Sequence, residues 1–261
     1  MTTFDATRAA KVLADAHTNR TAFENLSGAT APSGIDQAYE IQEALSDIWV
    51  AHKGPVAGLK IATTTKVMQA LMGIDHPCGG MIFKKTIRTS PATLASGEFM
   101  HAVIECELAV RMARDLPHRD TPYSSADVRA AVGNVMAAYE IIEDRNAVYK
   151  ETDAKTLIAD NAWNGGIVLG PEQTVPADKD LNGILGRLTK NGAPAGEGKT
   201  DDPMGALAWV ANLAATRGRP LKAGMVVITG SVIPTFALAD GDHITFELEG
   251  IGKTEMTFSG T

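Results

Sequence analysis

Two glutamates on one apolar segment are the residues that point most directly to chemistry. The run Ile104-Glu105-Cys106-Glu107-Leu108-Ala109-Val110 predicts a strand. Alternate side chains of a strand share a face, so Glu105 and Glu107 would project together roughly 7 Å apart while Cys106 points the other way. Two adjacent like charges need compensation, and carboxylates suit hard divalent cations such as Mg²⁺ or Mn²⁺. A solvated strand face remains the alternative, because this spacing by itself is weak evidence.

Other charged residues could complete such a site. Glu140 lies in the apolar run YEIIED, where a buried carboxylate needs a partner, whereas Glu143 and Asp144 resemble a charge cluster at the end of a strand. Lys60 stands inside VAGLKIA, where a lysine must either reach solvent or meet an anion. Asp75 lies in the turn GIDHPCGG, and stabilisation of that turn is an alternative to a catalytic role.

Composition and missing motifs exclude several function classes. The formal charge of −7 argues against a globally basic nucleic-acid binder. Only Cys78 and Cys106 are present, far apart, so neither a disulfide framework nor a CxxC zinc site is expected. The chain shows no HExxH, GxGxxG or GxxxxGK[ST] motif, which disfavours zinc hydrolases and nucleotide enzymes. It also shows no signal-peptide pattern or long apolar span, so we expect a cytoplasmic protein that neither binds nucleic acid nor spans a membrane.

The elements that would position these residues form a mixed α+β pattern. Helical spacing of apolar residues predicts helices at 5–16, 36–50, 125–138 and 203–217, and Ser33 or Asp36 could cap the second. Short apolar runs bounded by turn residues predict strands, which lie at 56–62, 81–83, 102–112, 139–144, within DNAWNGGIVLG, and in the last three segments of the chain. Because helices and strands do not alternate regularly, we expect a curled sheet or sandwich rather than a doubly wound fold.

Taken in order, five segments resemble one family. They are GLKIATTTKVMQALMGIDHPCGGMIF, IECELAV, AAYEIIEDR, DNAWNGGIVLG and LKAGMVVITGS. Together they are similar to the 2-keto-4-pentenoate hydratase and 4-oxalocrotonate decarboxylase group of the fumarylacetoacetate hydrolase superfamily. The resemblance implies a single catalytic domain over 1–261, built as a mixed β-sandwich or roll with flanking helices and a helical N-terminal portion at 1–52.

The same resemblance implies the roles of individual residues. It places a divalent ion, Mg²⁺ or Mn²⁺, on Glu105, Glu107 and Glu140. Lys60 and Asp75 are implied to line the active site, where Lys60 would neutralise negative charge on the substrate and Asp75 would transfer protons. Contacts to the substrate are implied for Asp160, Asn161, Trp163, Thr229, Gly230 and Ser231. The chain departs from the family at Trp163, where hydratases often have a serine, and this change puts the identity of the substrate in doubt.

Several activities fit this resemblance. We expect a hydratase that adds water to a 2-hydroxydienoate or 2-oxoalkenoate in the breakdown of aromatic compounds. Decarboxylation of a 2-oxo diacid of the 4-oxalocrotonate type is the nearest alternative, and hydrolysis of an acylpyruvate C–C bond comes third, because the N-terminal helices contain no convincing Glu-His dyad. A non-catalytic partner is disfavoured, because Lys60, Asp75 and the three glutamates are all present. The family also implies a homo-oligomer and a possible complex with a related decarboxylase or hydratase.

Overall fold

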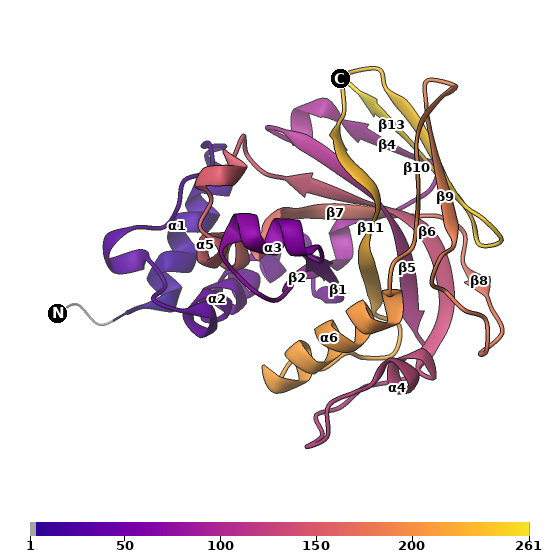
Figure 1. Ribbon diagram of the computed structural model, residues 1–261. Helices are drawn as coiled ribbons and strands as arrows, with labels where there is room; N and C mark the ends of the chain where they lie inside the picture. Colours follow the sequence, from indigo (N-terminus) through magenta and orange to yellow (C-terminus); the bar gives the residue numbers. More distant parts are fainter. Residues whose placement is uncertain (1–3, 261) are drawn as a thin grey trace.

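The computed structural model describes residues 4–260, in which helices pack against two curled β-sheets (Figure 1). The expected α+β class is confirmed. The α-helices are α1 (Ala6–Thr18), α2 (Ile35–Lys53), α3 (Lys66–Met72), α4 (Ser125–Arg129), α5 (Ala154–Ala159) and α6 (Pro203–Thr216). No helix in this part of the chain is long and apolar enough to cross a membrane. The assignment of the whole chain to one domain stays a prediction.

The larger sheet carries the predicted site residues. Its strand order is β2-β1-β11-β5-β6-β7-β3, and β8 pairs with β6. The bounds are β1 (Val56–Ala62), β2 (Cys78–Phe83), β3 (Ile87–Thr89), β5 (Ala102–Met112), β6 (Val132–Glu143), β7 (Asn164–Leu169), β8 (Gln173–Thr174) and β11 (Val226–Ala237). Most pairs are antiparallel, but β1 pairs with β11 and β3 with β7 in parallel.

The smaller sheet covers one face of the larger one. Its order is β10-β9-β12-β13-β4, formed by β4 (Ala92–Ala95), β9 (Leu185–Lys190), β10 (Ala193–Lys199), β12 (His243–Leu248) and β13 (Gly252–Ser259). Buried side chains from both sheets form one hydrophobic core, which includes Ile104 and Leu108 of β5, Phe246 of β12 and Met256 of β13. Because side chains alternate along a strand, Glu105 and Glu107 of β5 lie on the opposite face, toward the helices.

The N-terminal helices pack together on the side of the molecule away from the smaller sheet (Figure 1). Leu13 of α1 and Ile41, Leu45 and Trp49 of α2 are buried in one cluster, as the predicted helical spacing requires. The predicted side-chain cap of the second helix is wrong, because the N-cap of α2 is Gly34 without a capping side chain. Ser33 instead bonds to the side chain of Gln37.

The helix predicted over 125–138 is wrong beyond its first turns. Helix α4 ends at Arg129, and β6 begins at Val132. Residues 132–138 pair along nearly their whole length with β5, from Met112↔Val132 to Glu107↔Ala138. Apolar residues buried on both faces of a strand can match a helical spacing by chance, so the pairing with β5 overrides the local pattern.

Candidate metal centre

Three carboxylates converge on the helix-facing side of the larger sheet. Glu105 of β5 lies directly opposite Glu140 of β6 in the antiparallel register, and Glu107 follows two residues along β5. One oxygen from each of the three lies within 4.8 Å of the others. Glu107 and Glu140 are fully buried, and Glu105 is half-buried. Strand alternation therefore predicts the Glu105 and Glu107 pair, and the β5–β6 register adds Glu140.

Each glutamate has one oxygen held by the protein. The backbone N–H of Gly230 donates to Glu107 Oε2 at 2.7 Å, and Asn164 Nδ2 donates to Glu140 Oε1 at 2.9 Å. The hydroxyl of Thr235 donates to Glu105 Oε1 at 2.7 Å. Within residues 4–260, the buried atoms Glu107 Oε1 and Glu140 Oε2 have no hydrogen-bond partner. The protein thus fixes the orientation of each carboxylate and leaves the remaining oxygens of the two buried ones free.

Burial and mutual repulsion disfavour three negative charges at this place. Burial, together with Glu140 and Glu105, raises the pKa of Glu107 well above its ordinary value. Burial also raises the pKa of Glu140 to about 7, although Lys60 opposes this rise. Such shifts identify a cluster whose negative charge exceeds the positive charge beside it.

The donor set fits a divalent cation. Mg²⁺ holds oxygen ligands at about 2.0–2.1 Å and Ca²⁺ at about 2.3–2.6 Å, so oxygens across an ion lie about 4 to 5 Å apart. No two of the three carboxylate oxygens lie more than 4.8 Å apart, which is within the separation of oxygens on opposite sides of such an ion. Two of these carboxylates carry unpartnered buried atoms, which would otherwise cost free energy. Glu105, Glu107 and Glu140 would therefore hold the ion.

Lys60 lies beside this cluster. Its side chain is 1% exposed, and Nζ lies 2.9 Å from Glu140 Oε1 and donates to the carbonyl of Ala162 at 3.1 Å. Burial lowers the pKa of Lys60, but Glu140 and Glu105 outweigh that effect and raise it, so the side chain is an ammonium. A lysine ammonium has three donors, and two are assigned here, which leaves one for another oxygen.

A left-handed turn brings the Ala162 carbonyl to this lysine. Asn161, Ala162 and Trp163 have φ values of 55°, 46° and 56°. A non-glycine residue in this left-handed backbone conformation costs about 1–2 kcal/mol, and such strain persists only where the surrounding structure enforces it. Asn161 supplies part of that enforcement, because its side chain accepts from Met81 N at 2.7 Å and donates to Met81 O at 2.9 Å. Gly80 makes room for the turn, since a Cβ there would lie 2.8 Å from the carbonyl oxygen of Asn161.

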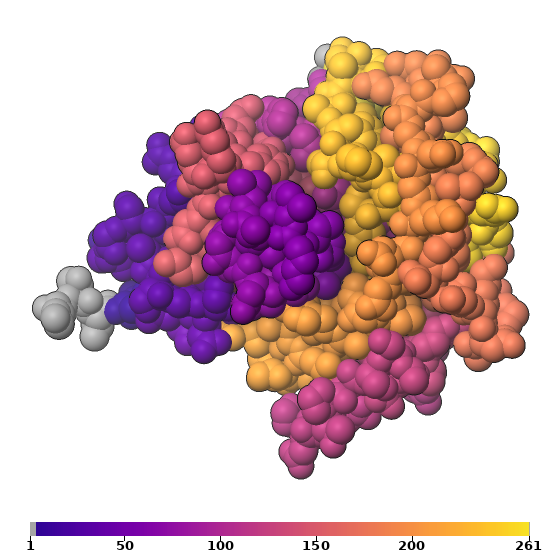
Figure 2. Space-filling model, in the orientation of Figure 1, coloured from indigo at the N-terminus to yellow at the C-terminus, as the bar shows by residue number. Residues whose placement is uncertain are grey.

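The cluster opens into a cavity of about 590 Å³, which we call the glutamate cavity. Lys60, Glu105 and Trp163 line it, together with Gly230 and Ser231 of β11. Figure 2 shows the α3 segment beside the C-terminal strands, and Met68 of α3 lines the same cavity as residues 230–235. The pairing of β11 with β5 is irregular along this stretch, and such irregularities are common next to active sites.

Three other residues with expected substrate contacts already bond within the protein. Asp160 is buried and bonds to His17 Nε2 at 2.6 Å and Arg145 Nη2 at 2.7 Å, and Asn161 is fully used by Met81. The hydroxyl of Thr229 donates to the carbonyl of Leu108 at 2.8 Å. Asp160 and Asn161 therefore support the turn and are not among the residues that line the glutamate cavity, and a substrate contact by either stays a prediction.

Two further expected donors are already bonded within the protein. The N–H of Gly230 is bonded to Glu107, and the hydroxyl of Ser231 donates to the carbonyl of Ile233 at 2.6 Å. Both residues nevertheless line the glutamate cavity, so their position agrees with the expectation even though these donors are committed.

Asp75 is separated from the other predicted residues. It is exposed on the segment between α3 and β2, where it lines another cavity with residues 34–35, 72–76 and 153–155. The structure therefore does not bring Asp75 together with Lys60 and the glutamates. A proton-transfer role for Asp75 would require movement of the segment that contains α3.

Several residues at the site were not predicted from the sequence. Asn164 and Thr235 orient two of the glutamates, and Tyr149 and Leu157 line the glutamate cavity. Asn164 directly follows the DNAW segment, and a polar residue at the start of a buried glycine-rich strand could have indicated its role at the site. Nothing in the sequence indicated a role for Thr235, because its contact with Glu105 depends on the irregular path of β11.

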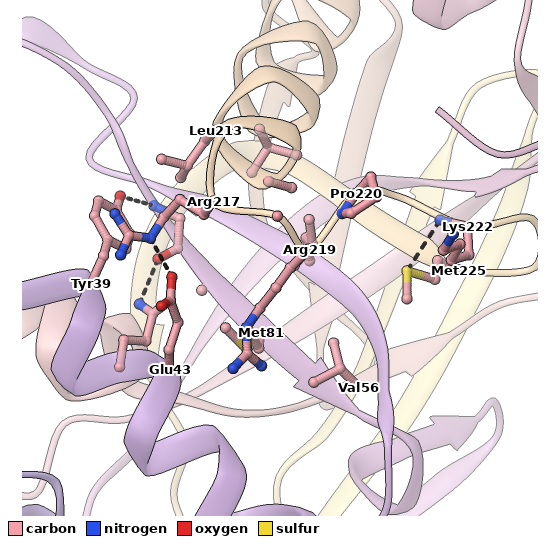
Figure 3. Close-up of a pocket in the computed structure, with 17 residues that line it drawn as sticks. Tyr39, Glu43, Val56, Met81, Leu213, Arg217, Arg219, Pro220, Lys222 and Met225 are labelled. Atoms are coloured by element: carbon pink, nitrogen blue, oxygen red, sulfur yellow. Dashed lines mark hydrogen bonds and ion pairs between the residues drawn. The ribbon is translucent and has the colours of Figure 1, made fainter. Parts of the chain in front are cut away.

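A second cavity of about 300 Å³ lies on the other face of β1, between α2 and the end of α6 (Figure 3). It contains Leu59, the neighbour of Lys60, and none of the sequence-predicted site residues lines it. Its three cations are each paired with an acid: Arg217 contacts Glu43, Arg219 lies 3.2 Å from Asp47, and Lys222 lies 3.5 Å from Asp115. This cavity therefore offers no free charge for an anionic ligand.

Comparisons with known proteins identify relatives of this chain. A family model described as "Fumarylacetoacetate (FAA) hydrolase C-terminal" matches residues 69–259. The chain is 31% identical over 231 residues to "2-hydroxyhexa-2,4-dienoate hydratase" of Comamonas testosteroni, covering 86% of each protein. It is 29% identical over 228 residues to "2-keto-4-pentenoate hydratase 2" of Dechloromonas aromatica (strain RCB), again covering 86% of each.

The fold is similar to a solved structure titled "4-oxalocrotonate decarboxylase from Pseudomonas putida G7 - complexed with magnesium and adipate". The TM-score is 0.88 at 24% identity, over 97% of each chain. This likeness shows the fold, and the family model covers most of the residues that form the site. The chain therefore belongs to the fumarylacetoacetate hydrolase family.

Proposed function

We propose that this protein is a divalent-metal-dependent hydratase, which adds water to a 2-hydroxydienoate in the breakdown of aromatic compounds. The observation that carries the proposal is the set of three oriented carboxylates beside a buried ammonium with one unassigned donor. The relatives at about 30% identity that are named hydratases support the reaction class. We propose Mg²⁺ or Mn²⁺ as the ion, because the ligands are all carboxylate oxygens.

The reaction needs two proton transfers and one C–O bond. The enol hydroxyl of the 2-hydroxydienoate loses its proton while C5 gains one, which gives a 2-oxo-3-alkenoate. The oxygen of water then bonds to C4, and C3 receives a proton, so that one water is added overall. Negative charge develops on the 2-oxygen in both steps, and a bound divalent ion would supply Lewis-acid stabilisation of that charge.

Lys60 provides the protein's own contribution at this oxygen. Its remaining N–H is available to hold a proton at the 2-oxygen, and its burial strengthens that interaction. The Glu140 carboxylate and the Ala162 carbonyl hold the ammonium in place, so no reorganisation is needed during the reaction.

The test is turnover of 2-hydroxypenta-2,4-dienoate with and without Mg²⁺, followed by loss of dienoate absorbance and by product mass. We expect a metal-dependent gain of one water. The second candidate is decarboxylation of a 2-oxo diacid, favoured by the structural likeness to the decarboxylase. Loss of CO₂ from such a diacid without hydration of the dienoate would replace the first proposal by the second. If the metal-loaded protein catalyses neither reaction, both proposals are refuted.

A further inference from the structure

One titratable side chain of the glutamate cavity has no part in the proposed function. Within residues 4–260, the titratable groups that line this cavity are Lys60, Glu105 and Tyr149. Lys60 is an ammonium without a lone pair, and Glu105 is assigned to the divalent ion. The hydration step needs a group that takes a proton from water, and Asp75 lies apart from the cavity. Tyr149 is the lining residue left for that task.

The hydroxyl of Tyr149 is bonded to a buried carboxyl group. It donates to Asp144 Oδ2 at 3.1 Å, and Asp144 is 1% exposed. Asp144 Oδ1 accepts from the backbone N–H of Asn146 at 2.9 Å and lies 2.8 Å from His101 Nδ1. An ionised carboxylate only accepts hydrogen bonds, so Nδ1 carries the hydrogen in this contact. Because the phenolic proton is directed to Asp144, the phenolic oxygen is left to accept a further hydrogen bond.

The strand pair that forms the glutamate cluster also places this carboxylate. The antiparallel register of β5 and β6 runs to the pair Ala102↔Glu143, so His101 and Asp144 meet directly beyond it. The chain then reverses through two residues of positive φ, and Tyr149 begins the 3₁₀ turn that follows. This reversal brings the Tyr149 hydroxyl back to Asp144.

Tyr149 is a neutral phenol in a fixed position. Its ring packs edge-on against that of Trp163, with centroids 5.2 Å apart. Burial, then Asp144 and then Glu105 raise the pKa of Tyr149, so the hydroxyl keeps its proton at neutral pH. Since Glu105 is among the charges that act on it, the hydroxyl lies within electrostatic reach of the glutamate cluster.

The other hydroxyls of the cavity lack such a base. Those at 63–65 have no carboxylate partner within residues 4–260. Ser231 donates to a backbone carbonyl, and Thr235 donates to Glu105, which is assigned to the ion. A hydroxyl exchanges protons poorly unless an adjacent group takes its proton. Tyr149 is therefore the lining hydroxyl that is equipped to activate water.

We propose that Tyr149 and Asp144 together form the general base of the hydration step. Tyr149 is the catalytic residue, which takes a proton from the attacking water and passes its own proton to Asp144. His101 is a positioning residue that holds the carboxylate. This inference rests on the proposed function and assigns its proton acceptor.

The proton transfers balance within this pair. The oxygen of water bonds to C4 while one of its protons moves to the Tyr149 oxygen and the phenolic proton moves to Asp144 Oδ2. The C3=C4 electron pair forms the C2=C3 bond, and the carbonyl pair moves to the 2-oxygen beside Lys60. When the carbonyl forms again, C3 takes a proton from Tyr149, and Asp144 returns its proton to the phenolic oxygen. The pair ends as it began, and the substrate has gained one water.

The first test separates the two parts of the reaction in Tyr149→Phe, which keeps the ring against Trp163 and removes only the hydroxyl. The Mg²⁺-loaded protein, in excess over 2-hydroxypenta-2,4-dienoate in D₂O, is followed by proton NMR for deuterium entry at C5 and for the hydrated product. After subtraction of the rate without protein, deuterium entry should fall less than about threefold, whereas hydration should fall at least about 100-fold. The 2-oxo-3-alkenoate should therefore accumulate.

The outcomes of this test are distinct. Hydration at the wild-type rate would overturn the inference, and so would an equal loss of both steps, which is what a distorted cavity would give. Tyr123→Phe is the matched control, because the Tyr123 hydroxyl donates to the Pro117 carbonyl at 2.6 Å and does not line the cavity. Both steps should keep their wild-type rates in this control. Absence of hydration by the metal-loaded wild type would refute the proposed hydratase and this inference with it.

A second variant tests whether the two residues act as a unit. Asp144→Asn keeps the shape of the side chain but removes the base, so hydration should fall about as far as in Tyr149→Phe. The double variant should be slower than either single variant by less than about threefold, because residues that act as a unit are not additive. Losses that multiply, or wild-type hydration by Asp144→Asn, would show that Asp144 does not take the proton. The Mg²⁺-dependent rise in Tm should persist in all three proteins, which shows that the fold and the ion site are intact.

Discussion

Replacing one buried glutamate by its neutral isostere should separate metal binding from folding. Glu105, Glu107, Glu140 and Lys60 comprise three carboxylates and one ammonium, so their formal charge is −2 when all are ionised. One divalent cation makes the group neutral. Glu107→Gln removes a fully buried ligand while its amide oxygen can still accept the N–H of Gly230.

The expected magnitudes follow from this charge balance. An ion present at 100 times its Kd stabilises the folded state by about 2.7 kcal/mol. At about 2–4 °C per kcal/mol for a chain near this size, Mg²⁺ should raise the Tm of the wild type by about 5 to 10 °C. Glu107→Gln should abolish most of that rise. Its metal-free Tm should equal or exceed the metal-free wild-type value, because the substitution removes a buried like charge.

Thermal unfolding followed by fluorescence, after dialysis against EDTA and with MgCl₂ added back, measures both quantities. Glu172→Gln is a matched control, because Glu172 pairs with Arg111 in a largely exposed ion pair and should keep the full response to Mg²⁺. An unchanged response of Glu107→Gln to Mg²⁺ would refute the assignment of the ligand. A metal-free Tm several degrees below wild type would refute the charge argument.

Three further predictions concern Lys60, Asp160 and Asp75. Lys60→Met should lower kcat by about 10²–10³-fold while the Mg²⁺-dependent rise in Tm persists, and steady-state kinetics showing unchanged kcat would exclude the proposed role. Asp160→Asn leaves the buried guanidinium of Arg145 without its carboxylate, so urea unfolding should show a loss of about 3–5 kcal/mol, against less than about 1 kcal/mol for Glu172→Gln. Burial raises the pKa of Asp160, but His17 and Arg145 outweigh burial, so the folded pKa lies below its ordinary value. The ionised Asp160 therefore contributes its full stabilisation above the unfolded pKa of about 3.9, and this stabilisation is lost as the pH falls through the lower folded pKa. Asp160→Asn should remove this pH dependence of stability. Asp75→Asn should lower kcat without changing metal binding, as the family resemblance implies. Because such a role requires movement of the segment that contains α3, substrate analogues should slow hydrogen exchange in that segment of the wild-type protein. Unchanged kcat would show that the Asp75 carboxylate takes no part in the reaction.

Much of the fold and the site could be predicted from local patterns. The helices at 6–18, 35–53 and 203–216 follow the spacing of apolar residues, and the last helix begins at Pro203. The strand period places Glu105 and Glu107 on one face, which the structure confirms. These inferences worked because each depends only on neighbours along the chain.

Long-range pairing decided the remainder. The register of β5 with β6 placed Glu140 opposite Glu105, and the same pairing turned residues 132–138 from a predicted helix into a strand. The left-handed turn at 161–163 directed the Asn161 side chain to Met81 and the Ala162 carbonyl to Lys60, so neighbours in sequence received different roles.

The sequence by itself therefore determined which residues are charged within apolar strands and which face of a strand they share. Only the tertiary structure decided which of those charges meet, and that Asp75 lies apart from them. The physical reason is that a strand's side-chain period is local, whereas the partner of a buried charge is supplied by another part of the chain.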